Sequence, residues 1–221
     1  MSKRIFFITG TDTSVGKTVF AALLTRHLRE SGVDVAALKP ICSGGREDAR
    51  LLRAAADNVL PLDEINPWHF RAPIAPLLAA RKEKKCVELP QVAKQIRSFQ
   101  KRFETLVVEG AGGLLSPLGE NFDSRDLLVE LSATPILICA NRLGAINQVL
   151  LARDALPKST AKKLQIILMS PPRPNVATRS NLELLAELTE PSRLHVFPWI
   201  TNLNAPLPQT AQTTLDAVRN G

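Results

Sequence analysis

The sequence predicts an α/β fold in which a mostly parallel β-sheet carries helices on both faces. Short apolar runs alternate along the chain with longer stretches of helical periodicity, which is typical of strand–helix–strand units with right-handed crossovers. The apolar runs are nearly continuous in Ile, Val, Leu and Phe, as expected for strands buried on both faces of a parallel sheet. The chain of 221 residues has the length of one domain, and we expect a single domain over residues 1–221.

Six apolar runs predict the strands of this sheet. In such a sheet the ligand site lies at the carboxyl ends of the strands. The predicted strands are Ile5–Thr9, Val33–Leu38, Thr105–Glu109, Pro135–Ala140, Gln165–Met169 and His195–Trp199.

Six segments between the strands predict helices. The first has apolar residues at helical spacing and ends at Gly32, a common stop signal. The stretch from Leu60 to Pro76 contains four prolines, so we expect neither a regular helix nor a central strand there. Long ordered loops of this kind are often binding loops. The predicted helices are Thr18–Ser31, Glu47–Asp57, Gln91–Arg102, Ser124–Leu131, Ile146–Leu156 and Thr178–Leu188.

The composition excludes several classes of protein. Hydrophobic residues make up 45% and charged residues 22% of the chain, so disordered, collagen-like and coiled-coil structures are not expected. No apolar run reaches the ~18 residues of a membrane helix, so we expect no membrane partner. The net charge is +7, but the basic residues are dispersed, which favours a solvated surface over nucleic-acid binding. The three cysteines share no metal-ligand spacing, which favours the cytoplasm.

The segment from Gly10 to Thr18, GTDTSVGKT, has the features of a phosphate-binding loop. It follows a predicted strand and opens a predicted helix, as such a loop requires. Gly10 and Gly16 permit the turn, and the N–H groups at the start of the helix favour an anion. Lys17 supplies a positive charge to the β- and γ-phosphates, and the Thr18 hydroxyl can bind Mg²⁺. Five residues separate the glycines where four are standard, but the segment still predicts nucleoside triphosphate binding.

Two further groups of residues follow predicted strands. Glu109 ends one strand, at the place where phosphate-loop proteins carry an acid that holds Mg²⁺ or its water. A structural glycine-rich turn is the alternative interpretation, and the phosphate loop favours the functional one. Lys39 directly follows another strand, with Ser43 and Asp48 nearby; a lysine there would lie beside the phosphate loop, although alone it is more typical of the surface. The small residues after Glu109 are Gly110, Ala111, Gly112 and Gly113.

Several segments match one family in order along nearly the whole chain. These segments are Gly10–Thr18, Lys39–Gly44, Asn66–Pro76, Glu109–Leu118, Leu143–Asn147 and Phe197–Trp199. On these residues the chain resembles the dethiobiotin synthetases, ATP-dependent enzymes of biotin synthesis with a P-loop NTPase-like fold. The phosphate loop of that family also has the extra residue between its glycines.

The resemblance implies a reaction in which 7,8-diaminononanoate, CO₂ and ATP give dethiobiotin, ADP and phosphate. One amine captures CO₂ as a carbamate, the carbamate oxygen attacks the γ-phosphate, and the second amine closes the ureido ring while expelling phosphate. Each step builds negative charge, so such a site should consist mainly of cations and N–H donors. The resemblance also implies Mg²⁺ as cofactor and a homodimer with the substrate site at the subunit interface.

The resemblance assigns roles to individual residues. Lys17 would bind the phosphates, and Lys39 would stabilise the carbamate and the phosphoryl group in transfer. Thr13 and Ser43 would position the carbamate. The implied Mg²⁺ ligands are Thr18, Asp48 and Glu109. The implied ATP contacts are Gly10, Asp12, Thr13, Ser14, Val15, Gly16, Lys17, Thr18, Glu109, Gly110, Ala111, Gly112, Gly113, Met169, Pro198 and Trp199. The implied substrate contacts are Ser43, Pro73 and a turn that reaches the partner's substrate carboxylate, formed by Leu143, Gly144, Ala145, Ile146 and Asn147.

The chain departs from the family pattern at two places. Ser14 stands where many family members have Glu, and Met169-Ser170 stands where some have an Asn that reads the nucleotide base. Looser base selectivity is therefore expected. Two other interpretations use the same fold: a ParA/MinD-like ATPase switch, whose signature lysine early in the loop is absent here, and an inactive homologue. A glutamine-dependent amidoligase would need a second domain, for which 221 residues leave no room.

Overall fold

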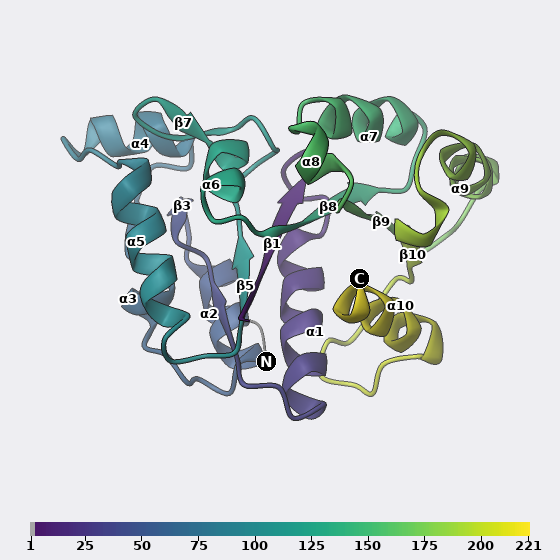
Figure 1. Cartoon of the computed structure of the whole chain (residues 1–221), viewed down its shortest axis with the longest axis horizontal. Helices are drawn as coiled ribbons and strands as arrows, with labels where there is room; N and C mark the ends of the chain where they lie inside the picture. The colour runs from purple at the N-terminus through teal and green to yellow at the C-terminus, as the bar shows by residue number, and fades with distance from the viewer. Residues whose placement is uncertain (1–2) are drawn as a thin grey trace.

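The computed structural model describes residues 3–221, and a six-stranded parallel sheet forms its centre (Figure 1). The strand order is β10-β9-β8-β1-β5-β2, and all neighbouring strands are parallel. All six predicted strands are confirmed. The last ends at Phe197 rather than Trp199, because Pro198 has no N–H to continue the pairing. The strands are β1 Arg4–Gly10, β2 Val35–Leu38, β5 Thr105–Glu109, β8 Thr134–Ala140, β9 Gln165–Met169 and β10 Leu194–Phe197.

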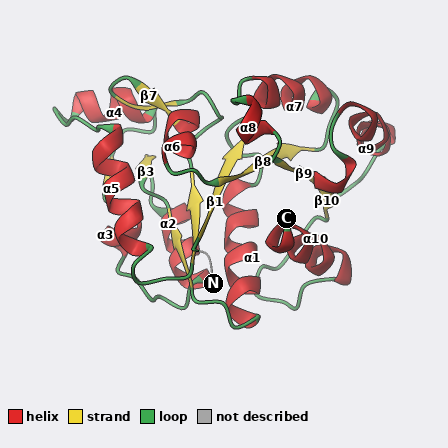
Figure 2. Cartoon of the chain, in the orientation of Figure 1, coloured by secondary structure: helices red, strands yellow, loops and turns green. Residues whose placement is uncertain are grey.

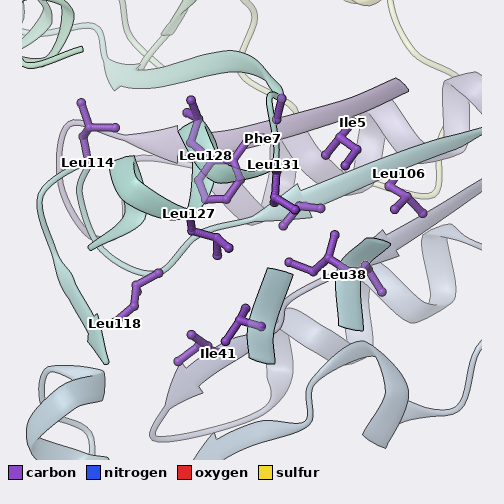
Figure 3. Packing of buried hydrophobic residues seen from close by; sticks show 14 of the residues in the cluster. Ile5, Phe7, Leu38, Ile41, Leu106, Leu114, Leu118, Leu127, Leu128 and Leu131 are labelled. Atoms are coloured by element: carbon purple, nitrogen blue, oxygen red, sulfur yellow. The ribbon is translucent and has the colours of Figure 1, made fainter. Parts of the chain in front are cut away.

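Helices cover both faces of this sheet, as the continuous apolar strands predict (Figure 2). In β1, Phe6 and Ile8 pack into one buried cluster, whereas Phe7 packs into the other, because successive side chains point to opposite faces. Figure 3 shows Phe7 among the leucines Leu127 and Leu128. On the Phe6 side lie α1 Lys17–Glu30, α2 Glu47–Ala55 and α10 Gln209–Asn220; on the Phe7 side lie α5 Leu89–Phe99, α6 Ser124–Glu130, α7 Ala145–Asp154 and α9 Val176–Leu188.

The proline-containing stretch Leu60–Pro76 is more structured than the sequence indicates. It has no central strand, as predicted, but it contains the single-turn helix α3 Leu62–Ile65 and the short strand β4 Trp68–Phe70. β4 pairs in parallel with β3 Ile41–Ser43, so both leave the central sheet. The following helix, α4 Pro76–Lys82, begins with proline at its first position, where no N–H is needed.

Several peripheral elements are not predicted by the sequence analysis. The helix α10 packs beside α1 (Figure 1). The predicted helix Gln91–Arg102 begins two residues earlier and ends at Phe99. Within residues 3–221, no helix is both long and apolar enough to cross a membrane. The remaining short elements are β6 Pro117–Gly119, β7 Phe122–Asp123, α8 Lys158–Ala161 and a 3₁₀ turn Pro191–Arg193.

Candidate active site

The phosphate loop connects the carboxyl end of β1 to the start of α1 (Figure 1). The backbone has positive φ at Ser14, 55°, and at Gly16, 103°. A Cβ atom on Gly10 would lie 2.9 Å from Val15 Cγ2, and one on Gly16 would lie 3.1 Å from Met169 Cε. Both positions therefore need glycine, which agrees with the sequence interpretation of this loop.

Lys17 is the first residue of α1, and its side chain curls back over the loop. Its Nζ donates to the Asp12 carbonyl oxygen at 2.6 Å. Burial and then the positive charge of Lys39 lower the pKa of Lys17 to about 8, partly opposed by nearby carboxylates. An anion in the loop would therefore meet a cation whose charge is not fully balanced by the protein.

Lys39 and Glu109 form a buried ion pair beside the phosphate loop. Lys39 Nζ donates to Glu109 Oε1 at 2.5 Å and lies 3.2 Å from Asp48 Oδ2. Thr18 Oγ1 donates to the same Glu109 oxygen at 2.9 Å. This arrangement follows from the strand order, because β5 lies between β1 and β2 and carries Glu109 at its carboxyl end.

The burial of Lys39 corrects the expectation that a lysine at this place is, by itself, more typical of the surface. Only 3% of the residue is exposed. Burial alone lowers the pKa of Lys39, but the carboxylates of Glu109 and Asp48 more than offset this, so the pKa lies above its ordinary value. Lys39 is thus held as a fixed ammonium in the site.

The residues around Glu109 fit a Mg²⁺ ion. Glu109 Oε2 is buried and has no hydrogen-bond partner among residues 3–221. With the Thr18 hydroxyl and the half-exposed carboxylate of Asp48, it offers the oxygen ligands that Mg²⁺ prefers. The described residues contain no cluster of three or more His, Cys, Asp or Glu suited to a metal.

One open cleft of about 1010 Å³ brings about half of the predicted residues together. Its floor is the Lys39–Glu109 pair, and its walls come from the phosphate loop, α2 and the loop before α4. The predicted residues that line it are Thr13, Ser14, Gly16, Lys17, Thr18, Lys39, Ser43, Asp48, Pro73, Glu109, Ala111 and Gly112.

The proline-containing loop packs onto β3 and thereby reaches the cleft. Ser43 Oγ donates to the Ile74 carbonyl oxygen at 2.5 Å. Pro73 packs closely on Gly44, so that a Cβ atom on Gly44 would lie only 3.3 Å from the Cβ atom of Pro73. Ser43 lines the cleft, and because its hydrogen is used in this way, its hydroxyl oxygen is left as an acceptor.

Comparison with known proteins identifies the family. A family model described as an AAA domain matches residues 4–207. The ATP-dependent dethiobiotin synthetase of Anaeromyxobacter dehalogenans strain 2CP-1 is 38% identical over 201 residues, which are 89% of this chain and 90% of that protein. The chain belongs to the dethiobiotin synthetase family. The enzymes of this name from Thermodesulfovibrio yellowstonii and Akkermansia muciniphila are 35% and 38% identical, covering 90% and 74% of this chain and 90% and 77% of their own lengths.

Solved structures support the fold of this dethiobiotin synthetase family member. A ParA family ATPase from Chlorobium tepidum superposes with a TM-score of 0.58 over 99% of this chain and 98% of its own, at 15% identity. The signal recognition particle receptor FtsY of Elizabethkingia anophelis gives 0.53 over 98% and 65%, at 14% identity. At such identities the likeness concerns the fold alone, so a ParA-like switch is not favoured over the family assignment.

Some residues implied by the dethiobiotin synthetase motifs lie outside the cleft. Met169 packs on Gly16 at the far side of the phosphate loop, and the Ser170 N–H donates to the Phe197 carbonyl oxygen at 2.9 Å. Trp199 follows and is 56% exposed. The cleft lining omits Gly10, Asp12, Val15, Gly110, Gly113, Met169, Pro198 and Trp199.

The turn Leu143–Asn147 also lies away from the cleft, at the start of α7. Leu143 is 87% exposed, and Gly144 precedes the helix with φ 91°. The next turn of α7 lines a second cavity of about 450 Å³ with the outer side of the phosphate loop. Within one chain, this turn and the cleft are therefore separate.

Nine residues not chosen from the sequence as site residues also line the cleft: Val19, Cys42, Glu47, Leu51, Ile74, Ala75, Pro76, Ser116 and Pro117. Leu51 lies three residues after Asp48, so helical spacing from Asp48 could have identified it, and Glu47 lies four residues before Leu51 on the same helix. Cys42 lies beside Ser43, and Ser116 Oγ accepts from the Gly113 N–H at 2.8 Å. Ile74 could not have been identified from the sequence, because only the three-dimensional path of its loop brings it to the cleft.

Proposed function

We propose that this chain is an ATP-dependent dethiobiotin synthetase that converts 7,8-diaminononanoate and CO₂ to dethiobiotin. The observation that carries this proposal is the buried Lys39–Glu109 pair facing the phosphate loop across one cleft. The relatives named above are ATP-dependent enzymes. The Lys39 ammonium would pair with the acidic second reactant beside the γ-phosphate.

Lys39 and the phosphate loop hold the reacting groups in line. The first amine attacks CO₂ and releases a proton, which gives a carbamate anion that pairs with the Lys39 ammonium. A carbamate oxygen then attacks the γ-phosphorus, and ADP leaves while Lys17 and the loop N–H groups stabilise the charge on the phosphates. Such positioning removes much of the entropic cost of bringing three reactants together.

The second amine then attacks the carbamoyl carbon, closes the five-membered urea and expels phosphate. Ser43 offers its hydroxyl oxygen as an acceptor for an amine N–H, because its own hydrogen is bonded to Ile74. Thr13 lies across the same cleft and would orient the carbamate. When bound, Mg²⁺ would neutralise phosphate charge, held by Thr18, Glu109 and Asp48.

The second half of the substrate site would come from another copy of the chain. The turn Leu143–Asn147 opens α7, and its N–H groups suit a carboxylate. The exposed Leu115 and Leu151 line the cavity beside it, an apolar surface that a second copy would cover. We therefore propose a homodimer in which this turn binds the carboxylate of a substrate held in the partner's cleft.

The three free cysteines suit the cytoplasm.

The proposal is tested by incubating purified protein with diaminononanoate, bicarbonate, ATP and Mg²⁺. The expected result is ATP hydrolysis that depends on the diamine, with dethiobiotin identified by mass spectrometry. Lys39→Ala serves as the matched control, because it removes the ammonium and keeps the phosphate loop. ATP hydrolysis that proceeds equally without the diamine, and yields no dethiobiotin, would contradict the proposal.

A further inference from the structure

Lys39 stands where the chain leaves the central sheet. β2 pairs with β5 up to Leu38, which lies opposite Val108. From Ile41 onward the chain pairs with β4 instead. The backbone of Lys39 therefore lies between two sheets, outside both ladders, although its ammonium is held at 2.5 Å from Glu109. Something other than strand pairing has to fix this backbone.

The side chain of Asn66 supplies a hydrogen bond at this point. Asn66 Nδ2 donates to the Lys39 carbonyl oxygen at 2.7 Å, and the Lys39 N–H donates to the Ile65 carbonyl oxygen at 3.0 Å. Only 1% of Asn66 is exposed. The residue after it, Pro67, has no N–H. The side-chain amide therefore takes the place of a backbone donor and keeps a buried carbonyl satisfied.

Two donors fix the orientation of this amide. Asn66 Oδ1 accepts from Arg46 Nε at 3.1 Å and from Cys42 Sγ at 3.2 Å. Because its oxygen faces two donors, the NH₂ group faces Lys39. Arg46 also donates to the Asn66 backbone carbonyl and immediately precedes α2, which carries Asp48. One buried network thus joins the Lys39 backbone to the helix of its second carboxylate partner.

We propose that Asn66, oriented by Arg46, is a positioning residue for the Lys39 ammonium. The inference rests on the proposed function, in which Lys39 acts on the carbamate and the phosphoryl group. Without the Asn66 donor, the Lys39 carbonyl is left buried and unpaired, and the segment from Lys39 to Cys42 shifts to reach another partner. Among residues 3–221 the hydrogen bonds of Asn66 go to Lys39, Cys42, Arg46 and Leu62 and not to the phosphate loop, so we expect nucleotide binding to be retained.

The first test separates turnover from nucleotide binding. Asn66→Ala and Asn66→Asp should each lower kcat at least tenfold, which is the effect expected when the Lys39 ammonium moves by somewhat less than about 1 Å. The ATP dissociation constant should stay within about threefold of the parent value. Asn66→Asp retains an acceptor for Arg46 but no donor for Lys39, so its loss should match that of Asn66→Ala.

Leu215→Ala on α10 is the control for a loss of stability alone, because Leu215 is fully buried on the other face of the sheet. It should lower the melting temperature and leave kcat unchanged. The inference is overturned if kcat in the Asn66 variants stays within about twofold of the parent, or if Leu215→Ala lowers kcat as much as they do.

A double-mutant cycle decides whether Asn66 acts through Lys39. In a Lys39→Ala background, Asn66→Ala should lower the residual kcat less than about twofold, since the group that it positions is already absent. A second, independent tenfold loss would show that Asn66 has a general structural role and would overturn the inference.

Hydrogen exchange tests, without any measurement of turnover, whether Asn66 holds the Lys39 backbone in place. Asn66→Ala should speed amide exchange in the peptide that covers residues 38–44, while the peptide over residues 5–10 of β1 stays unchanged. If the parent forms no dethiobiotin, the proposed function fails, but this measurement still tests whether Asn66 holds the Lys39 backbone in place. Unchanged exchange over residues 38–44 would overturn the inference whatever the activity.

Discussion

The two halves of the candidate site differ in how many of their contacts are made within one chain. At the carboxyl ends of β1, β5 and β2, Lys39 and Glu109 are buried, and Thr18 and Lys39 both donate to Glu109. At the start of α7 and after β10, Leu143 and Trp199 are largely exposed. The first half is a prearranged set of charges, whereas the second is an exposed surface that, in the proposed function, would gain its contacts from a nucleotide base or a second copy.

This difference indicates which properties each half should control. Prearranged charges act on the chemical step, because they are aimed at charge that develops during the reaction and need no reorganisation. An exposed turn or loop acts on recognition, because it gains its contacts only when a ligand or partner arrives. Substitutions in the first half should therefore reduce turnover, and those in the second should change affinity or specificity.

The largest effect is expected for Lys17→Ala. The lysine lies where the transferring phosphoryl group carries charge, so its removal should cost several kcal/mol in the transition state, at least about a hundredfold in kcat. The fold should remain, because Lys17 Nζ bonds only the Asp12 carbonyl within residues 3–221. Steady-state kinetics at saturating ATP, with circular dichroism as the control, check this. Turnover within about tenfold of the parent would contradict the proposed role.

A smaller loss, partly reversible by Mg²⁺, is expected for Glu109→Gln and Asp48→Asn. Each amide keeps the shape of the carboxylate and removes the charge that would hold the ion. Glu109→Gln should have the greater effect, because Glu109 is buried and also balances Lys39, whereas Asp48 is half exposed. Rates measured across a Mg²⁺ series should show a raised half-saturation and partial recovery. Unchanged Mg²⁺ dependence in both variants would remove them from the metal site.

Mixing two inactive variants tests whether the second half comes from the partner. Lys17→Ala disables the phosphate loop, and Asn147→Glu places a negative charge in the exposed turn. In a heterodimer, one of the two sites would combine an intact loop with an intact turn. Random reassociation should therefore restore about a quarter of the parental activity. Absence of recovery in a verified heterodimer would mean that each site is complete within one chain.

The first half of the site could largely be predicted from the sequence. Gly10, Lys17 and Glu109 follow apolar strands, and the rule that sites form at the carboxyl ends of parallel strands places them together. The burial of Lys39 could not be predicted, because it depends on the pairing of β3 with β4 in a stretch with several prolines. The bond from Asn66 to Lys39 joins residues 27 positions apart and leaves no periodic signal.

The second half of the site could not be predicted from residue patterns, for a different reason. Leu143–Asn147 and Trp199 are predicted as site residues only through the family resemblance, since exposed turns have no burial pattern that would identify them. The helix α10 was missed because its apolar positions Ala211, Leu215 and Val218 are interspersed with threonine and glutamine, which weaken the helical pattern.

The smallest expected effect concerns the nucleotide base. In the proposed function the γ-phosphate would lie beside Lys39 and Glu109, on the β5–β2 side of the loop, so the nucleoside should extend to the opposite side, where Met169 packs on Gly16. Few groups there can read a base: Met169 offers a weak thioether acceptor, the Ser170 N–H is bonded to Phe197, and Pro171 has no N–H.

GTP or CTP should therefore support turnover within roughly tenfold of ATP, about 1.4 kcal/mol. Ser170→Asn would place a side-chain amide, which can pair with both the donor and the acceptor edge of adenine, beside the proposed base position, and it should sharpen the preference for ATP. Initial rates with four triphosphates, each at several concentrations, measure both changes. A preference for ATP of about a hundredfold in the parent would show that backbone groups near Pro198 already read adenine, and that this exposed half of the site discriminates without a side-chain amide.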